Sequence, residues 1–324
     1  MNYVFGPVPS RRLGQSLGVD PIPLKTCNWN CVYCQLGRTM PVTHALREYF
    51  PREAIFSEIK QALAAHEPGD IDWVTFVGSG EPTLHAGLGW MIQQTQAITD
   101  LPTAVITNGS LLYLPAVREA LLSANAVLPS LDAGTAVLYR HLNRPHPEAT
   151  FDRLVAGLIA FRQAYRGQLW VEVMLLQGLN DTEAALREIQ SILLQVRPDQ
   201  VHLNLPTRPP AETWVRPSDD AGLLRAQAIL GDAARVVLPA AGHFDLRGEE
   251  GVETAVIRII QRHPISQQEL ERILDEWAPG RQAEVLASLA ANPHVQRVER
   301  MGVRFWSAAT AHFPNKNQRP ESCR

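Results

Sequence analysis

Three of the four cysteines of this 324-residue chain lie within eight positions of one another, as Cys27, Cys31 and Cys34. Cysteines crowded in this way indicate a metal site, because disulfide frameworks are typical of small secreted chains. A cuboidal 4Fe-4S cluster normally takes four thiolates, so three would leave one iron open. A structural zinc ion also needs four ligands, and the nearest fourth ligand is His44, since Cys323 lies far along the chain.

Two carboxylates, Glu81 and Glu172, lie in sequence contexts that are typical of ligand-binding sites. Residues 78–82 read Gly-Ser-Gly-Glu-Pro, in which glycines let a backbone approach a ligand closely and Glu81 can pair with an ammonium group. Glu172 interrupts the apolar run 170–176. A carboxylate on a buried strand must be paired or face a cavity, so Glu172 is either a ligand contact or the partner of an arginine inside the fold.

The elements that would position these side chains alternate from about residue 17 to residue 240. Short runs rich in Val, Ile and Leu predict parallel strands buried on both faces, and the stretches between them have helical periodicity. The predicted strands are 16–20, 73–77, 104–107, 126–130, 170–176 and 200–205, with an addition at 235–238. The predicted helices include 52–65, 88–99, 114–124, 149–164 and 182–195. This βα repeat predicts a barrel whose loops after the strands carry the chemistry.

The cysteine run CNWNCVYC resembles the cluster motif of the radical S-adenosylmethionine (SAM) superfamily, including the aromatic Tyr33 before the third cysteine. The resemblance implies an α/β fold, a partial (β/α)6 barrel over residues 1–242. It implies a 4Fe-4S cluster on the three cysteines, with the open iron chelated by the amino and carboxylate groups of SAM. The implied activity is reductive cleavage of SAM to a 5'-deoxyadenosyl radical, which abstracts hydrogen from a substrate.

The same resemblance extends to the loops after the later strands. The 78–82 turn is similar to the family's GGE motif, with Ser79 replacing a glycine, and Thr-Asn-Gly-Ser at 107–110 resembles a turn near the methionine moiety. Residues 130–132 match the ribose-contact position, and Asn204 would lie beside the adenine or the substrate. With Glu172, the expected SAM-binding residues are Tyr33, Gly78, Ser79, Gly80, Glu81, Asn108, Ser130, Asp132, Glu172 and Asn204.

Arg11 and Arg12 precede the first predicted strand and either bind a carboxylate or phosphate or remain solvated at the surface. Their surroundings, FGPVPSRRLGQSLGVD, resemble a subgroup of radical SAM proteins loosely similar to the wyosine-base synthases of tRNA modification. This resemblance transfers no substrate, because function resides in the site rather than in the fold. The substrate could therefore be a tRNA base, a peptide or a small metabolite.

The βα alternation ends near Gly242. We expect a linker over 243–258, a small α+β domain over 259–310 and a disordered tail over 311–324. Within the small domain, the Ser-x-x-Glu pattern at 266–269 opens a helix, a second helix covers 281–290, and the runs 295–298 and 303–306 form a hairpin. Helices followed by a hairpin suggest a winged-helix-like module.

Three arginines and two aromatic residues fall on that hairpin. Arg297, Arg300 and Arg304 could touch a nucleic-acid backbone, and Phe305 and Trp306 could stack on a base. The module is mixed in charge, however, and a protein-docking or lid role is the alternative.

The composition fits a globular protein, with 45% apolar residues, 19% charged residues and a formal net charge of -3. No run approaches the ~20 apolar residues of a membrane span, and the first residues lack the apolar core of a signal peptide. We therefore expect a cytoplasmic protein with no membrane contact.

Two functions from different classes compete. The first is the radical SAM enzyme, which needs a reductant such as flavodoxin or ferredoxin and binds a tRNA or protein substrate through the C-terminal module. The second is a regulator that senses redox state with the cluster and reads nucleic acid with the winged helix. A sensor needs no SAM pocket, so Gly80, Glu81 and Asp132 favour the enzyme.

Overall fold

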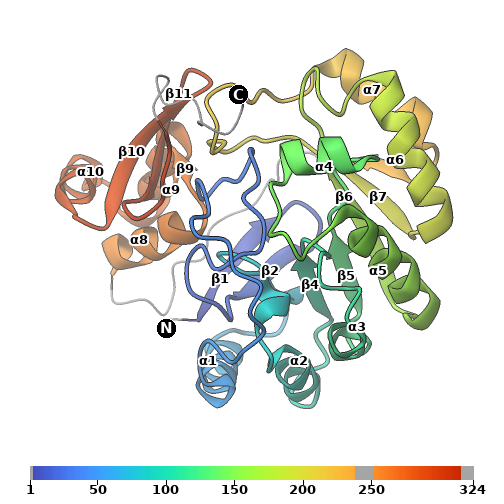
Figure 1. Ribbon diagram of the computed structural model, residues 1–324. Helices are drawn as coiled ribbons and strands as arrows, with labels where there is room; N and C mark the ends of the chain where they lie inside the picture. Colours follow the sequence, from blue (N-terminus) through green and yellow to red (C-terminus); the bar gives the residue numbers. More distant parts are fainter. Residues whose placement is uncertain (1–2, 238–250, 315–324) are drawn as a thin grey trace.

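The computed structural model describes residues 3–237 and 251–314, which form a large sheet wrapped by helices and a smaller domain beside it (Figure 1). The large sheet has the strand order β1-β2-β3-β4-β5-β6-β7-β8, with β1 antiparallel to β2 and the other neighbours parallel. Its strands are β1 Val4–Ser10, β2 Gly14–Val19, β3 Trp73–Phe76, β4 Thr103–Thr107, β5 Ala126–Pro129, β6 Gln168–Met174, β7 Gln200–Asn204 and β8 Ala234–Val236. The predicted α/β partial barrel is confirmed.

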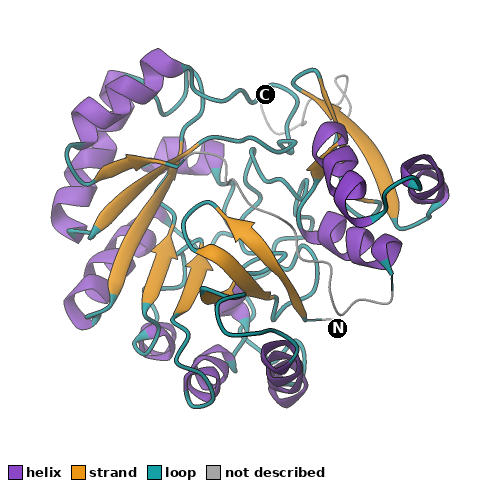
Figure 2. Cartoon of the chain, turned by 180° about the vertical axis from the view of Figure 1, so that it is seen from behind, coloured by secondary structure: helices purple, strands orange, loops and turns teal. Residues whose placement is uncertain are grey.

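Helices cover the outer face of this curved sheet, as the view from behind shows (Figure 2). The helices of this domain are α1 Arg52–Ala64, α2 Leu88–Gln96, α3 Pro115–Leu121, α4 Ala136–Leu142, α5 Phe151–Ala164, α6 Glu183–Val196 and α7 Asp220–Leu230, and a 3-10 turn, η1 Pro82–Leu84, follows β3. Valines of the strands pack against the apolar faces of the helices in one core, for example Val74 and Val105 with Ile55 and Ile59. Burial on both faces explains why the strands read as continuous apolar runs.

The strand β1 was not among the predicted strands. Its sequence VFGPVPS carries Pro7 and Pro9, which cannot donate to a sheet ladder and therefore argue against a strand in the interior of a sheet. The structure accommodates them because β1 lies at the edge of the sheet, where β2 is its one partner among the described strands, and the register shifts between Phe5 and Val8. The short helices α4 and α7 also lay outside the prediction.

The smaller domain has its own sheet and its own core. It contains α8 Val252–Arg262, β9 Ile265–Ser266, α9 Gln267–Trp277, α10 Gln282–Ala291, β10 Val295–Arg300 and β11 Val303–Ala308, with the antiparallel strand order β10-β11-β9. The Ser266 hydroxyl accepts the backbone N–H of Glu269, as the Ser-x-x-Glu pattern predicts.

The boundary of this domain differs from the sequence-based expectation. Residues 252–258, assigned to a linker, form the first turns of α8, because Ala255 and Val256 belong to the same apolar face as Ile259 and Ile260 and fill the second core. Residues 243–250 of the expected linker and residues 315–324 of the expected tail, which include Cys323, lie outside the described residues.

The structure of the hairpin β10–β11 contradicts the prediction that its aromatic residues stack on a base. Phe305 and Trp306 are only 4% and 3% exposed, so neither ring can stack on a base without unfolding the domain. Successive residues of a strand point to opposite faces, so the two rings are buried on opposite sides of β11, with Trp306 in the core of the smaller domain. Arg297 and Arg304 are exposed, whereas Arg300 donates to the backbone carbonyl of Pro314 at 2.8 Å.

The two domains meet where α8 lies beside β1 (Figure 1). The Arg262 guanidinium lies 5.3 Å from the centre of the Phe5 ring, and the His263 and Phe5 rings are 5.4 Å apart. Val8 of β1 packs against the core of the smaller domain. The open side of the partial barrel is therefore bordered by the C-terminal domain.

Candidate functional site

The barrel encloses a cavity of about 400 Å³ that collects most of the residues singled out in the sequence. Its lining includes Cys27, Cys31, Cys34, Tyr33, Gly78, Ser79, Gly80, Glu81, Asn108, Ser130, Glu172 and Asn204. These residues lie near the ends of successive parallel strands, where loops of a βα barrel converge. Two candidates from the sequence do not line this cavity: Asp132, and His44, the proposed fourth ligand of a zinc site.

The three cysteine thiols are close enough to influence one another. Burial raises the pKa of the Cys27 thiol to about 12, and burial together with the neighbouring Cys34 and Cys27 raises the pKa of Cys31 well above its ordinary value. The backbone N–H of Trp29 donates to Cys27 Sγ at 3.4 Å. Thiols of this kind stay protonated until a metal displaces the proton.

Side-chain N–H groups surround the other two sulfurs. Lys25 Nζ donates to Cys34 Sγ at 3.2 Å, and Asn143 Nδ2 donates to Cys31 Sγ at 3.7 Å. Hydrogen bonds to cluster sulfur ligands stabilise negative charge on them. The donor set therefore fits a 4Fe-4S cluster held by three thiolates.

No group of three His, Cys, Asp or Glu side chains in the described parts of the chain is arranged to hold a single metal ion. The thiolates of a 4Fe-4S cluster each bind a different iron, so that arrangement is not required of them. His44, the fourth ligand that a zinc site would need, instead bonds Tyr113 Oη at 3.0 Å and stacks on His146.

The glycine-rich turn packs directly against the cysteine loop. A Cβ on Gly80 would lie 1.9 Å from the Thr26 carbonyl oxygen, which also accepts the backbone N–H of Glu81 at 2.9 Å. Only glycine allows this approach of two backbones. Ser79, the replacement for the family's glycine, donates its hydroxyl to Asp20 Oδ2 at 2.5 Å.

Glu81 is 1% exposed and joins two of the predicted turns. Its Oε1 accepts the Thr83 N–H at 3.0 Å, the Thr83 hydroxyl at 2.5 Å and the Thr107 hydroxyl at 2.6 Å. From the described residues, Oε2 accepts one hydrogen bond, from the Asn108 N–H at 2.6 Å. Burial raises the pKa of this carboxyl, and the hydrogen bonds oppose that shift. Of its two oxygens, Oε2 is the one with acceptor capacity left for an ammonium group.

The Asn108 side chain ties its own turn to the cysteine loop. Its Nδ2 donates to Asn28 Oδ1 at 2.7 Å, and its Oδ1 accepts the Ser110 hydroxyl at 2.7 Å. Asn28 in turn donates to that hydroxyl at 2.7 Å. This closed ring of hydrogen bonds fixes the turn after β4 beside Cys27.

Asp132 is placed differently from the expected ribose contact. It is 2% exposed and accepts hydrogen bonds from the Tyr33 hydroxyl, from Asn143 Nδ2 at 2.7 Å and from the Met174 N–H at 2.9 Å. A buried carboxylate needs such partners, and they leave it inside the wall rather than in the cavity. Asp132 therefore orients Tyr33, and Ser130 is the residue of that strand end that lines the cavity.

Glu172 forms an ion pair with an arginine, which was one of its two predicted roles. Its Oε1 lies 2.5 Å from Nη1 of Arg12, and the same Nη1 donates to Asn204 Oδ1 at 3.1 Å. Arg12, from the turn between β1 and β2, thus reaches β6 and β7 across the barrel. Both partners still line the cavity.

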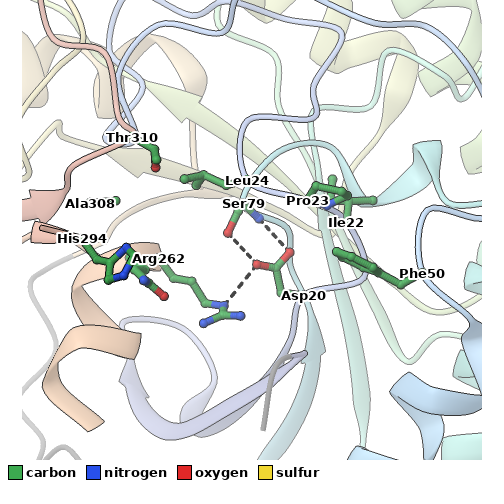
Figure 3. Close-up of a pocket in the computed structure, with 11 residues that line it drawn as sticks. Asp20, Ile22, Pro23, Leu24, Phe50, Ser79, Arg262, His294, Ala308 and Thr310 are labelled. Atoms are coloured by element: carbon green, nitrogen blue, oxygen red, sulfur yellow. Dashed lines mark hydrogen bonds and ion pairs between the residues drawn. The ribbon is translucent and has the colours of Figure 1, made fainter. Parts of the chain in front are cut away.

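A second, smaller cleft of about 250 Å³ lies between the two domains (Figure 3). Arg262 of α8 reaches Asp20 Oδ2 at 3.2 Å, and Ser79 approaches the same carboxylate. Burial raises the pKa of Asp20, and the charge of Arg262 opposes that shift. The C-terminal domain is therefore linked to the glycine-rich turn through one buried carboxylate.

Several residues of the site were missed in the sequence. Lys25 adopts φ 62° two residues before Cys27, and Asn143 reaches Cys31 from a distant loop. Only Lys25 carried a local signal, a cation next to the cysteine run.

The comparisons with known proteins agree with this geometry. The family model described as the radical SAM superfamily matches residues 22–189, just over half of the chain. A UPF0026 protein from Methanocaldococcus jannaschii is 34% identical over 280 residues, which cover 85% of this chain and 87% of that protein. A protein named GTPase Obg from Brachyspira hyodysenteriae is 43% identical over 224 residues, 69% of this chain but only 33% of the length of that protein.

Two solved structures with low sequence identity are also similar. A structure of TYW1 with a lysine-pyruvate adduct is 12% identical, with a TM-score of 0.45, and covers 91% of this chain and 80% of that one. A radical SAM methyltransferase from Sphaerobacter thermophilus is 17% identical, with a TM-score of 0.48, over 68% of this chain and 66% of that one. On the family match and the Methanocaldococcus relative, the chain belongs to the radical SAM superfamily, which implies a 4Fe-4S cluster and SAM as its cofactors.

Proposed function

We propose that this protein cleaves SAM reductively and uses the resulting 5'-deoxyadenosyl radical to abstract hydrogen from a substrate. One electron enters, the bond between the sulfonium sulfur and C5' breaks, and methionine is released. The radical becomes 5'-deoxyadenosine when it takes the hydrogen atom. A bound 4Fe-4S cluster would supply the electron.

One observation carries the proposal: three cysteine thiols and the Gly-Ser-Gly-Glu-Pro turn face a single cavity in a chain of the radical SAM superfamily. In this proposal Cys27, Cys31 and Cys34 hold the cluster. Glu81 Oε2 accepts a hydrogen bond from the SAM ammonium group, and Ser130 forms a hydrogen bond with the ribose. The remaining expected contacts, among them Tyr33 for the adenine and Gly78, Asn108 and Asn204, are residues that also line the cavity.

Glu172 and Asp132 have positioning roles in this proposal. Glu172 holds Arg12 across the barrel, and Asp132 holds the Tyr33 ring through its hydroxyl. Because protein donors enclose Asp132, we do not assign it to SAM, whereas Glu172, which lines the cavity, stays a candidate contact of SAM or the substrate.

The reaction requires an external electron, for which we propose a donor of the flavodoxin or ferredoxin type in the cytoplasm. In the described parts of the chain, no helix has both the length and the apolar character needed to cross a bilayer. We further propose that the winged-helix-like C-terminal domain helps to admit a tRNA, protein or small-molecule substrate, since it borders the open side of the barrel. Membership in an enzyme superfamily favours catalysis over a role as a redox-sensing regulator.

The test is an anaerobic assay of reconstituted protein. We expect about four irons and four sulfides per chain. After reduction with dithionite, the protein should convert SAM slowly to 5'-deoxyadenosine and methionine without added substrate. Replacing Cys27, Cys31 and Cys34 together by Ala should abolish both the iron and the products, whereas Cys323→Ala should keep both. Protein that holds iron but binds no SAM would refute the proposal.

A further inference from the structure

One side of the cavity is strongly basic. Arg11, Arg12, Arg208 and His263 line the same space as the three cysteines. They come from the turn between β1 and β2, from the segment after β7 and from the end of α8, which are far apart in the sequence. The fold therefore gathers three guanidinium groups at one place.

Within the described parts of the chain, two of these arginines bond only to neutral groups. Arg11 Nη2 donates to the Thr207 hydroxyl at 2.7 Å, and Arg208 Nη1 donates to the backbone carbonyl of Pro264. Arg12, by contrast, forms its ion pair with Glu172. Each guanidinium carries five N–H donors, so Arg11 and Arg208 retain unused donor capacity.

Among the described residues, two carboxylates line this cavity, Glu81 and Glu172. Glu172 is paired with Arg12, and Glu81 accepts four hydrogen bonds at the glycine-rich turn. Glu269 of α9 opposes the lowering of the pKa of Arg11 and Arg208 but forms an ion pair with neither in the described parts of the chain. Positive charge therefore exceeds negative charge on this wall.

Burial makes this excess of positive charge energetically unfavourable. Burial lowers the pKa of both Arg11 and Arg208, and for Arg11 the neighbouring guanidinium groups of Arg208 and Arg12 lower it further. Arginine nevertheless keeps its proton in proteins. A partly buried cation without a counter-charge is unfavourable, so an anion entering here would gain both charge pairing and hydrogen bonds.

The His263 ring adds a neutral polar group at the same wall. Its Nε2 is buried and has no hydrogen-bond partner among the described residues. Burial, followed by the charges of Arg208, Arg262 and Arg11, lowers its pKa to about 3, so the ring is neutral at pH 7. A neutral imidazole can accept from, or donate to, a bound group without adding repulsion.

We propose that Arg11 and Arg208 bind a phosphate or carboxylate group of the substrate inside this cavity, which makes the substrate an anionic small molecule. The inference rests on the proposed function, because the same cavity would hold SAM. Arg12 lies beside this proposed anion site but already forms an ion pair with Glu172. The internal location, bordered by the C-terminal domain, favours a small molecule over the exposed backbone of a nucleic acid.

The experiment is a thermal-shift titration at constant ionic strength with two probes, inorganic phosphate and acetate. An anion that binds only the folded state raises the melting temperature by an amount that grows with the logarithm of its concentration relative to its Kd. We expect phosphate, acetate or both to stabilise the wild-type protein. Arg11→Ala and Arg208→Ala should each weaken the affinity of the effective probe about tenfold, the size of one charged hydrogen bond.

Arg304→Ala is the matched control, because it removes the same charge from an exposed position of β11. It should titrate like the wild type. Equal anion affinity in all four proteins would overturn the inference, as would the absence of any stabilisation. A third arm with mixed tRNA tests the other class of ligand: loss of tRNA binding in both variants, with no effect of phosphate or acetate, would also overturn it.

Lys substitutions guard against misfolding. Arg11→Lys and Arg208→Lys keep the charge but lose the planar fork, so we expect intermediate affinities. The SAM assay is run on the same wild-type preparation. Protein that cleaves SAM without binding either anion would refute this inference alone, and arginine-dependent anion binding without SAM cleavage would refute the proposed function alone.

Discussion

The residue with the most direct influence on the cysteines is Lys25. Its ammonium group donates to Cys34 Sγ at 3.2 Å and to the Gly37 carbonyl at 2.7 Å. A cluster gains negative charge on reduction, and a cationic donor at one of its sulfur ligands stabilises the reduced form.

Replacing this lysine should therefore make the cluster harder to reduce. For Lys25→Met we expect the reduction potential to fall by on the order of 50 mV, the equivalent of one charged hydrogen bond. An anaerobic redox titration followed by electron paramagnetic resonance measures it. Lys60→Met, at an exposed position of α1, is the control and should leave the potential unchanged. An unshifted potential in Lys25→Met protein with full iron content would contradict this role.

At the scale of elements, the contact between α8 and the end of β2 does most to join the domains to the site. Arg262 pairs with Asp20, and Asp20 also accepts the Ser79 hydroxyl and the Ser79 N–H. Removing the arginine leaves the buried Asp20 carboxylate without its positive partner. Loss of one partner of a buried ion pair strongly destabilises the folded protein.

For Arg262→Ala we expect a loss of about 3 kcal/mol in the free energy of unfolding. We also expect weaker SAM binding, because the glycine-rich turn loses its fixed anchor. Urea denaturation and calorimetric titration with SAM measure the two effects, and Arg304→Ala is again the matched control. If stability fell while SAM affinity stayed at the wild-type value, the domain would be a structural support without influence on the turn.

At the scale of the whole molecule, docking of the C-terminal domain makes stability depend on pH. His263 has a pKa of about 3 in the folded protein against an ordinary value of 6.5. Below pH 6.5 the unfolded chain binds a proton at this ring that the folded protein does not. The ring's contribution is therefore complete above pH 6.5 and is lost as the pH falls toward 3, by up to ~1.4 kcal/mol per pH unit.

Substituting the ring should remove this part of the acid sensitivity. We expect His263→Gln to lose about 2 kcal/mol less stability than the wild type between pH 7 and pH 5. Urea denaturation at the two pH values measures it. Carboxylates titrate in the same range in both proteins, so the comparison isolates the histidine. Identical pH profiles would show that His263 is accessible to protons in the folded state.

Local patterns determined much of this protein. The strands β2 to β8 followed from apolar runs, because burial on both faces leaves a continuous signal in the sequence. The cysteine spacing and the 78–82 turn predicted the cluster site, since the residues of each motif are neighbours in the chain. The edge strand β1 escaped notice because its prolines obscure a strand that pairs on one side only.

The tertiary structure alone decided which polar groups are free to act. The sequence left Glu172 between two roles, and the fold pairs it with Arg12. The fold also directs Asp132 toward Tyr33 and buries both Phe305 and Trp306, with Trp306 in the second core. The grouping of Arg11 with Arg208 depends on a hairpin turn and a distant loop meeting across the barrel. Contacts between residues nearly two hundred positions apart leave no periodicity in a sequence, because they arise only when the elements pack.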